Sequence, residues 1–286
     1  MKRHFNNIKI VTLLIPFLLL VASCHKDNTS FSYDDAVETT SGYAEGQQMA
    51  NLILNTYFKS ITDSTLLADG TSEIDGANVS YSTDPLEISI KYAWDIPDGY
   101  GHYRKGTITA TSENGFFDSL DVINLSFNSF YYDLDSVHVG SFEITNKGLS
   151  VNHNYIFDIV GSSIFRQTTD SLGVKVSHMI FNLQQEFVRH KDASSIYHTP
   201  DDYFRISGNL NGTARNGFAF SGNVNSENHL LSAYSCNWLK SGVVDVTLAE
   251  FIYDAQLNFD NGGECKNEYS IIINESLFRK AFDEKK

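Results

Sequence analysis

The fold is decided by an alternating stretch, LEISIKYAW, at residues 86–94. Apolar side chains occupy every second position, which is the pattern of a half-buried strand with one wet face. Stretches of the same period follow as far as residue 274, and turn signals such as Asn-Gly and Gly-Gly separate them. Their apolar positions include Ile123, Leu125, Phe127, Phe204, Ile206, Leu210, Phe218, Phe220, Val244, Val246, Ile271 and Ile273. The sequence therefore predicts a mainly β fold, a bent antiparallel meander over about 86–274 that forms a half-barrel or a sandwich.

A helical period precedes the strands. Between about residues 44 and 61, apolar residues recur every three or four positions, as at Met49, Ile53 and Tyr57. This spacing places them on one face of a helix. We expect one N-terminal amphipathic helix, about 44–61, packed on the sheet within a single β-rich domain that spans 34–286.

The first 24 residues have the organisation of a secretory signal. Basic residues precede an apolar run, and small residues then lead to a cysteine in the segment VASC at residues 21–24. This segment resembles a bacterial lipobox, which implies that residues 1–23 are removed and that Cys24 carries a diacylglycerol. The alternative is an uncleaved transmembrane anchor, but the apolar run is shorter than the ~20 residues that span a bilayer. Residues 24–33 are polar and without periodicity, which predicts a tether.

These features predict a lipid-anchored protein of the outer membrane that faces the periplasm or the cell surface. His25 follows the lipidated cysteine, whereas the retention signal of some inner-membrane lipoproteins has an aspartate there. Membrane attachment through the lipid on Cys24 is therefore the one partner interaction that the sequence predicts directly.

Charge excludes one class of partner. The formal net charge is −14, and removal of residues 1–23, which carry three basic and no acidic residues, makes it −17. Such a polyanion is repelled by nucleic acid and by anionic lipid surfaces. No nucleic-acid partner is expected, and membrane attachment has to come from acyl chains rather than from a basic patch.

Three cysteines are present, and lipidation of Cys24 leaves an even pair, Cys236 and Cys265. In an oxidising compartment such a pair predicts a disulfide. The alternative is two buried free thiols.

The densest group of possible catalytic side chains lies between His190 and Asp202 and includes His198. Its spacing matches neither His-Glu-x-x-His nor a closed zinc site, and solvated loops are ordinarily rich in such residues. Residues 260–264 have some likeness to a calcium loop but lack its alternating ligands, so a hairpin turn is the favoured interpretation. No catalytic residue, metal ligand or cofactor is predicted.

Aromatic residues are the other candidates for ligand contact. Tyr131 and Tyr132 are adjacent, so in an extended strand they point to opposite faces. If one of these two rings or the ring of Trp94 is exposed, it would stack on a sugar or fill a lipid groove. The alternative is that the helix or a second sheet covers both faces.

The C-terminal third resembles uncharacterised outer-membrane lipoproteins of Bacteroidetes-type bacteria. The similar segments are DDYFRISG at residues 201–208, the Cys-x-Trp-x-x-x-Gly-like unit that begins at Cys236, and GECKN at residues 263–267. Lys266 stands where that group typically has an aspartate, which weakens a metal-binding interpretation of the last turn. Because the group has no assigned function, the resemblance implies little about activity.

Three functional hypotheses remain at this point. The favoured one is a non-enzymatic envelope lipoprotein with a structural or binding role, whose partner is a glycan, a lipid or another envelope protein. The second is a glycan- or lipid-binding carrier or receptor. The third is a hydrolase that uses the loop between His190 and Asp202.

Overall fold

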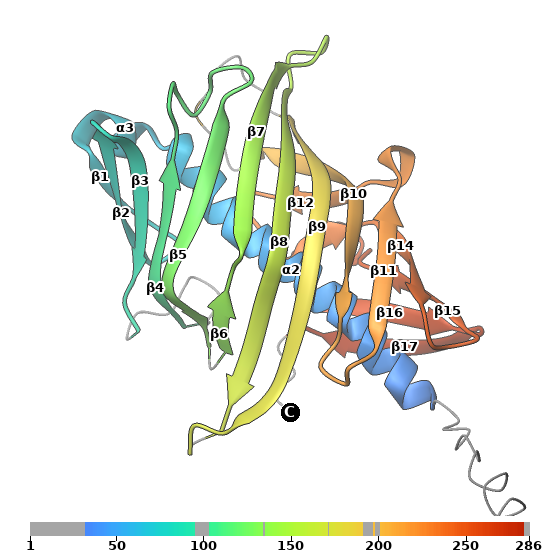
Figure 1. Ribbon diagram of the computed structural model, residues 1–286. Coiled ribbons are helices and arrows are strands. Elements are labelled where there is room, and N and C mark those ends of the chain that lie inside the picture. The colour runs from blue at the N-terminus through green and yellow to red at the C-terminus, as the bar shows by residue number, and fades with distance from the viewer. Residues whose placement is uncertain are drawn as a thin grey trace, which may run out of the picture. The chain divides into compact units, whose positions relative to one another are not determined.

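The computed structural model describes residues 32–94, 103–133, 135–170, 172–190, 197 and 201–282. Tyr33–Lys286 form one compact unit. As predicted, this unit is mainly β, with one large antiparallel sheet and one long N-terminal helix (Figure 1). The lipobox, Cys24 and His198 lie outside the described residues. Within the described ranges, no helix has both the length and the hydropathy needed to cross a bilayer.

Within these residues the sheet contains 17 strands. They are β1 (Thr71–Ile74), β2 (Ala77–Thr83), β3 (Leu86–Tyr92), β4 (Arg104–Thr111), β5 (Val122–Tyr132), β6 (Asp135–His138), β7 (Ser141–Leu149), β8 (Tyr155–Thr169), β9 (Lys175–His190), β10 (Tyr203–Thr213), β11 (Ala219–Val224), β12 (Leu230–Ala233), β13 (Leu239–Ser241), β14 (Val243–Leu248), β15 (Asp254–Asn258), β16 (Glu268–Ile273) and β17 (Ser276–Ala281). The helical elements are α2 (Tyr33–Ile61), α3 (Ser64–Asp69) and the short 3-10 helix η2 (Ser226–Asn228).

Most strands pair with their neighbours in sequence, as in a meander, and every pairing is antiparallel. One exception is β11, which pairs with β14, because β12 and β13 form a separate hairpin beside β10. Long β8 pairs with β9 on one side and with both β6 and β7 on the other. Strand β10 pairs with β9 and then with both β11 and β12. The strands form one sheet rather than two stacked ones, and this sheet curves around α2, so the half-barrel describes it better than the sandwich (Figure 1).

Helix α2 begins at Tyr33, 11 residues before the predicted start, so the predicted tether ends one residue early. The missed turns contain residues that favour helices poorly, because β-branched threonines lose side-chain freedom and glycine loses backbone freedom in a helix. Tertiary packing overrides this preference. The hydroxyl groups of Thr39 and Thr40 donate to backbone carbonyls one turn earlier, at 2.7 Å each. Gly42 has room for no side chain, because a Cβ atom there would lie 2.6 Å from the Cβ of Ala214.

The helix is also more deeply buried than an amphipathic helix on a sheet surface. Ile53 and Tyr57 lie in the core, as predicted. However, the polar residues Gln47, Asn51 and Asn55 on other faces are buried as well. The sheet therefore surrounds α2 instead of covering a single stripe of it.

The sheet extends beyond the predicted limits at both ends, from Thr71 to Ala281. Strands β1 and β2 join through Asp75 and Gly76, which both have positive φ, as in the tight turns that connect hairpins. Strands β16 and β17 join through Asn274 and Glu275, which also have positive φ. The turn between β16 and β17 contains no glycine, so the sequence pattern did not predict β17.

Candidate functional site

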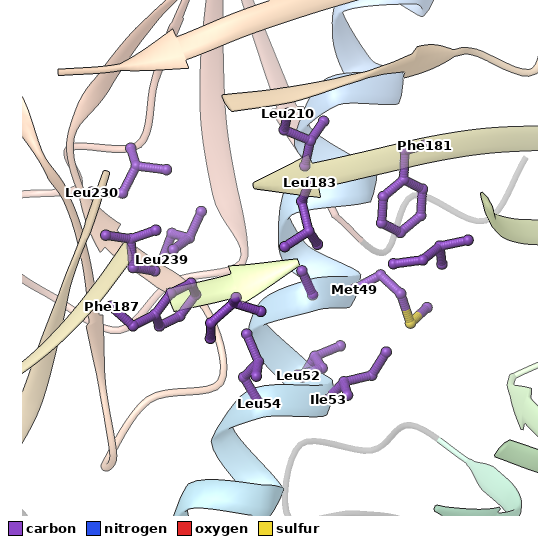
Figure 2. Close-up of a cluster of buried hydrophobic side chains, with 14 of the residues drawn as sticks. Met49, Leu52, Ile53, Leu54, Phe181, Leu183, Phe187, Leu210, Leu230 and Leu239 are labelled. Atoms are coloured by element: carbon purple, nitrogen blue, oxygen red, sulfur yellow. The ribbon is translucent and has the colours of Figure 1, made fainter. Parts of the chain in front are cut away.

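The C-terminal half of α2, residues 47–61, is enclosed by apolar side chains from the surrounding strands. Figure 2 shows Leu52, Ile53 and Leu54 of the helix among leucine and phenylalanine side chains of β9, β10, β12 and β13. Farther along, the Phe58 ring lies 4.5 Å from the Phe204 ring and 4.7 Å from the Phe157 ring, centroid to centroid. This half of the helix is the centre of the core.

A group of buried hydrogen bonds lies along one side of the same half of α2. The side-chain amides of Gln48 and Asn51 donate to the backbone carbonyl of Asn237, at 2.6 and 3.1 Å. The Asn55 amide donates to the Cys236 carbonyl at 3.4 Å. Cys236 is in turn joined to Cys265 by a disulfide, with a Cα–Cα distance of 5.6 Å. The disulfide predicted from the cysteine count therefore holds the loop whose backbone carbonyls accept hydrogen bonds from Gln48, Asn51 and Asn55.

The N-terminal half of α2, residues 33–46, borders an open groove. A cavity of about 260 Å³ lies between one face of the helix, the β10–β11 turn and the end of β17. Its helix face carries acidic and small residues at helical spacing, and its opposite walls carry two cations and two aromatic rings. The lining residues are Asp34, Val37, Glu38, Ser41, Gly42, Glu45, Arg215, Tyr269, Lys280, Ala281 and Phe282. We call this cavity the α2 groove.

A four-charge cluster closes the inner end of the α2 groove. Arg215 contacts Glu45 at 3.2 Å and Asp135 at 2.9 Å. Arg166 pairs with the same two carboxylates, and the Thr168 hydroxyl donates one hydrogen bond to Asp135. Burial by itself lowers the pKa of Arg166, but the adjacent Asp135 and Glu45 outweigh burial and raise it. The cluster combines two basic and two acidic side chains, and it joins α2, β6, β8 and the β10–β11 turn.

Of the aromatic candidates, Tyr132 lies nearest to the groove. It lines a small cavity of about 20 Å³ that shares Glu45 and Phe282 with the α2 groove. The Arg166 guanidinium lies 5.4 Å from the centroid of its ring. Because Tyr132 is buried, its ring forms part of the wall and presents no open stacking face.

The other two aromatic candidates lie elsewhere. Trp94 is 44% exposed, and its ring centroid lies 6.5 Å from that of Tyr103. Tyr131 is half-buried, with the Lys105 ammonium 5.7 Å from its ring centroid. Neither residue lines a cavity among those described, so the sequence-derived set does not come together at one site.

At the two described ends of the loop proposed for a hydrolase, His190 and Asp202 have separate partners. The His190 ring stacks on the Tyr203 ring, with 4.9 Å between the ring centroids. Burial lowers the pKa of His190, and the nearby Arg205 and His229 lower it further. Asp202 is fully buried in an ion pair with Arg189, at 2.6 Å. His198 lies outside the described residues.

Metal ligation finds no support within the described ranges, where no group of three or more His, Cys, Asp or Glu side chains is placed to hold an ion. In the turn at residues 260–264, the Asp260 carboxylate accepts a hydrogen bond from the Gly262 amide. Glu264 pairs with Lys266 at 2.5 Å instead. The turn has the local hydrogen bonding of a loop connection.

Sequence reasoning missed the α2 groove, although one signal was present. Asp34, Glu38 and Glu45 recur at helical spacing, but Asp34 and Glu38 precede the predicted start of the helix. The lining residues that lie outside α2 come from positions more than 160 residues away in sequence. No protein-family model, curated protein or solved structure matches the chain.

Proposed function

We propose that this chain is a non-enzymatic lipoprotein, anchored in the outer membrane through Cys24, that binds a saccharide unit of a glycan in the α2 groove. The observation that carries the proposal is the groove itself, a cavity of about 260 Å³ with both charged and aromatic walls. Ligand pockets for drug-sized molecules typically have ~300–1,000 Å³, so this one suits a single small unit.

The lining favours a hydroxyl-rich ligand over an acyl chain. Asp34, Glu38 and Lys280 supply acceptors and a donor, and Phe282 supplies an apolar surface beside them. A lipid carrier would need a long apolar cavity, whereas α2 and its neighbours fill the interior (Figure 2). The cavity that continues inward has only about 20 Å³, which is room for about one water molecule.

The two described ends of the candidate catalytic loop make contacts away from the groove. Asp202 is held in a buried ion pair, and His190 is stacked on Tyr203. Neither side chain lines the α2 groove. The membrane anchor in this proposal rests on the lipobox at residues 21–24.

The binding proposal is tested with the mature chain carrying Cys24→Ser, titrated calorimetrically with a panel of neutral, amino and acidic monosaccharides and short oligosaccharides. Lys280→Ala removes a groove donor and should weaken binding by about tenfold, since one hydrogen bond to a charged group contributes roughly 1.5 kcal/mol. Arg279→Ala is the matched control, because Arg279 is exposed on the same strand and does not line the groove.

Two results would count against the proposal. One is the absence of binding across the panel. The other is equal weakening by the two substitutions, which would indicate a general charge effect rather than a contact in the groove.

The anchor is tested separately by metabolic labelling with radioactive fatty acid. Label should enter the wild-type chain and be lost in Cys24→Ser, because the acyl chains are expected on that residue alone. Label retained by the variant would refute lipidation at Cys24.

A further inference from the structure

Several turns at one end of the sheet expose large aliphatic side chains. Ile252 in the β14–β15 turn is 92% exposed, and Leu172 in the β8–β9 turn is 84% exposed. Val174 and Leu277 are also exposed at this end. We call Leu172, Val174, Ile252 and Leu277 the anchor-side tips.

These tips lie at the end of the domain where α2 begins. The Tyr33 ring stacks on Tyr253, the neighbour of Ile252, at 5.0 Å. The Tyr33 hydroxyl accepts a hydrogen bond from Asn274 in the β16–β17 turn, at 3.1 Å. Asn216 in the β10–β11 turn donates to the Asp35 carbonyl at 3.0 Å, and the β8–β9 turn lies at this end of the sheet too.

The chain that precedes Tyr33 limits how far this end can move from a lipid anchor. Eight residues separate Cys24 from Tyr33. Fully extended, a segment of this length spans at most ~30 Å. Ile252 is next to Tyr253, whose ring stacks on Tyr33, so a lipid on Cys24 would keep Ile252 within about this distance of the bilayer surface.

We propose that the anchor-side tips insert into the interface of the bilayer that holds the lipid, and so orient the domain on the membrane. This inference rests on the proposed anchoring through Cys24. Apolar insertion also suits a polyanionic domain, because electrostatic attraction cannot hold it there.

The opposite end of the sheet provides a matched comparison. Val151, in the β7–β8 turn, is 95% exposed, so it is as apolar and as accessible as Ile252. It lies beyond the other end of the 15-residue strand β8, which at roughly 3.3 Å per residue is about 45 Å long. If exposure alone caused membrane contact, the two ends would behave alike.

The test supplies the anchor chemically, so that it does not depend on lipidation in the cell. The unlipidated mature chain is coupled through the Cys24 thiol to phosphatidylcholine vesicles that contain a maleimide lipid and brominated phosphatidylcholine. Ile252→Trp, Leu172→Trp and Val151→Trp are compared after subtraction of the signal of the parent protein, which contains Trp94 and Trp238. Circular dichroism checks that each variant is folded.

We expect roughly threefold greater bromine quenching for the tryptophan probes of Ile252→Trp and Leu172→Trp than for that of Val151→Trp, because inserted side chains lie ~5–10 Å into the interface. Quenching equal at all three positions, or no higher than in the parent, would overturn the inference. Failure of fatty-acid labelling in cells would instead overturn the anchor and leave this comparison of the two ends intact.

Discussion

The two halves of α2 belong to one continuous helix, but only the first half has a face that borders a cavity. Residues 47–61 are enclosed by aromatic and aliphatic side chains and by the loop that the disulfide fixes. Residues 33–46 are packed in the core on one side, as at Tyr43, and on the other side they border a cavity with charged and aromatic walls. Burial of apolar surface stabilises a fold, whereas a ligand site needs accessible polar groups. We therefore expect the enclosed half to contribute more to stability, and the proposed binding concerns the half along the groove.

The largest expected contrast between the halves is the cost of removing a phenylalanine. Phe58→Ala should lower the free energy of unfolding by about 3–5 kcal/mol, because it deletes a fully buried ring from the core. Phe282→Ala, at the half-buried edge of the groove, should cost about half as much or less. Urea unfolding of both variants measures the difference, and equal costs would break the contrast.

The second contrast concerns the disulfide. Cys236 and Cys265 are 29 residues apart, and closing a loop of that length stabilises a fold by roughly 3–4 kcal/mol in the chain-entropy model. Replacing both cysteines with serine should lower stability by about that amount. Thiol counting on the denatured mature chain should find Cys24 as the sole thiol once lipidation is prevented, and two further thiols would show that the bond does not form.

The four-charge cluster lies between the two halves and should have an intermediate effect. Asp135→Ala leaves Arg166 and Arg215 with Glu45 as their shared carboxylate, so like charges face each other with less compensation. Because the cluster is partly solvated, we expect a loss of about 1–3 kcal/mol, below the cost of breaking a fully buried pair. Combining Asp135→Ala with Arg215→Ala should recover part of the loss, and strictly additive losses would argue against coupling.

The smallest effect is a pH dependence near the enclosed half. Burial by itself raises the pKa of Asp121, but hydrogen bonds from Ser112, Asn114 and Gly115 outweigh it and hold the pKa below its usual range. The ionised form therefore stabilises the fold above pH ~4, and this contribution disappears as the pH falls through the lowered pKa. Asp121→Asn should destabilise the protein at pH 7 and match the wild type in strong acid. Denaturant midpoints across this range measure the effect, and a gap that does not depend on pH would contradict the assignment.

Sequence reasoning found the features that depend on local period. The alternation at residues 86–94 gave the correct β class, and the three-and-four spacing of Met49, Ile53 and Tyr57 marked the enclosed part of the helix. These patterns can be recognised in the sequence because the buried side chains of one face repeat every two residues in a strand and every three to four in a helix.

The groove could not be found in this way. Its walls come from α2, the β10–β11 turn, β16 and β17, which meet only after the sheet has curved around the helix. The helical turns that face it contain Thr39, Thr40 and Gly42, which are poor helix formers. They remain helical because of contacts with distant strands, and these contacts leave no periodic trace in the sequence.

The most direct test of the division between the halves is to fill the groove without disturbing the core. Ser41→Trp places a large side chain in the cavity, and Ser64→Trp is the control, since Ser64 is exposed at the start of α3 just beyond the enclosed half. Saccharide titration and urea unfolding are measured on both variants. We expect Ser41→Trp to abolish binding and Ser64→Trp to leave it unchanged, and both variants should keep their unfolding free energies within about 0.5 kcal/mol of the parent. Undiminished binding in Ser41→Trp would contradict the assignment of function to the groove.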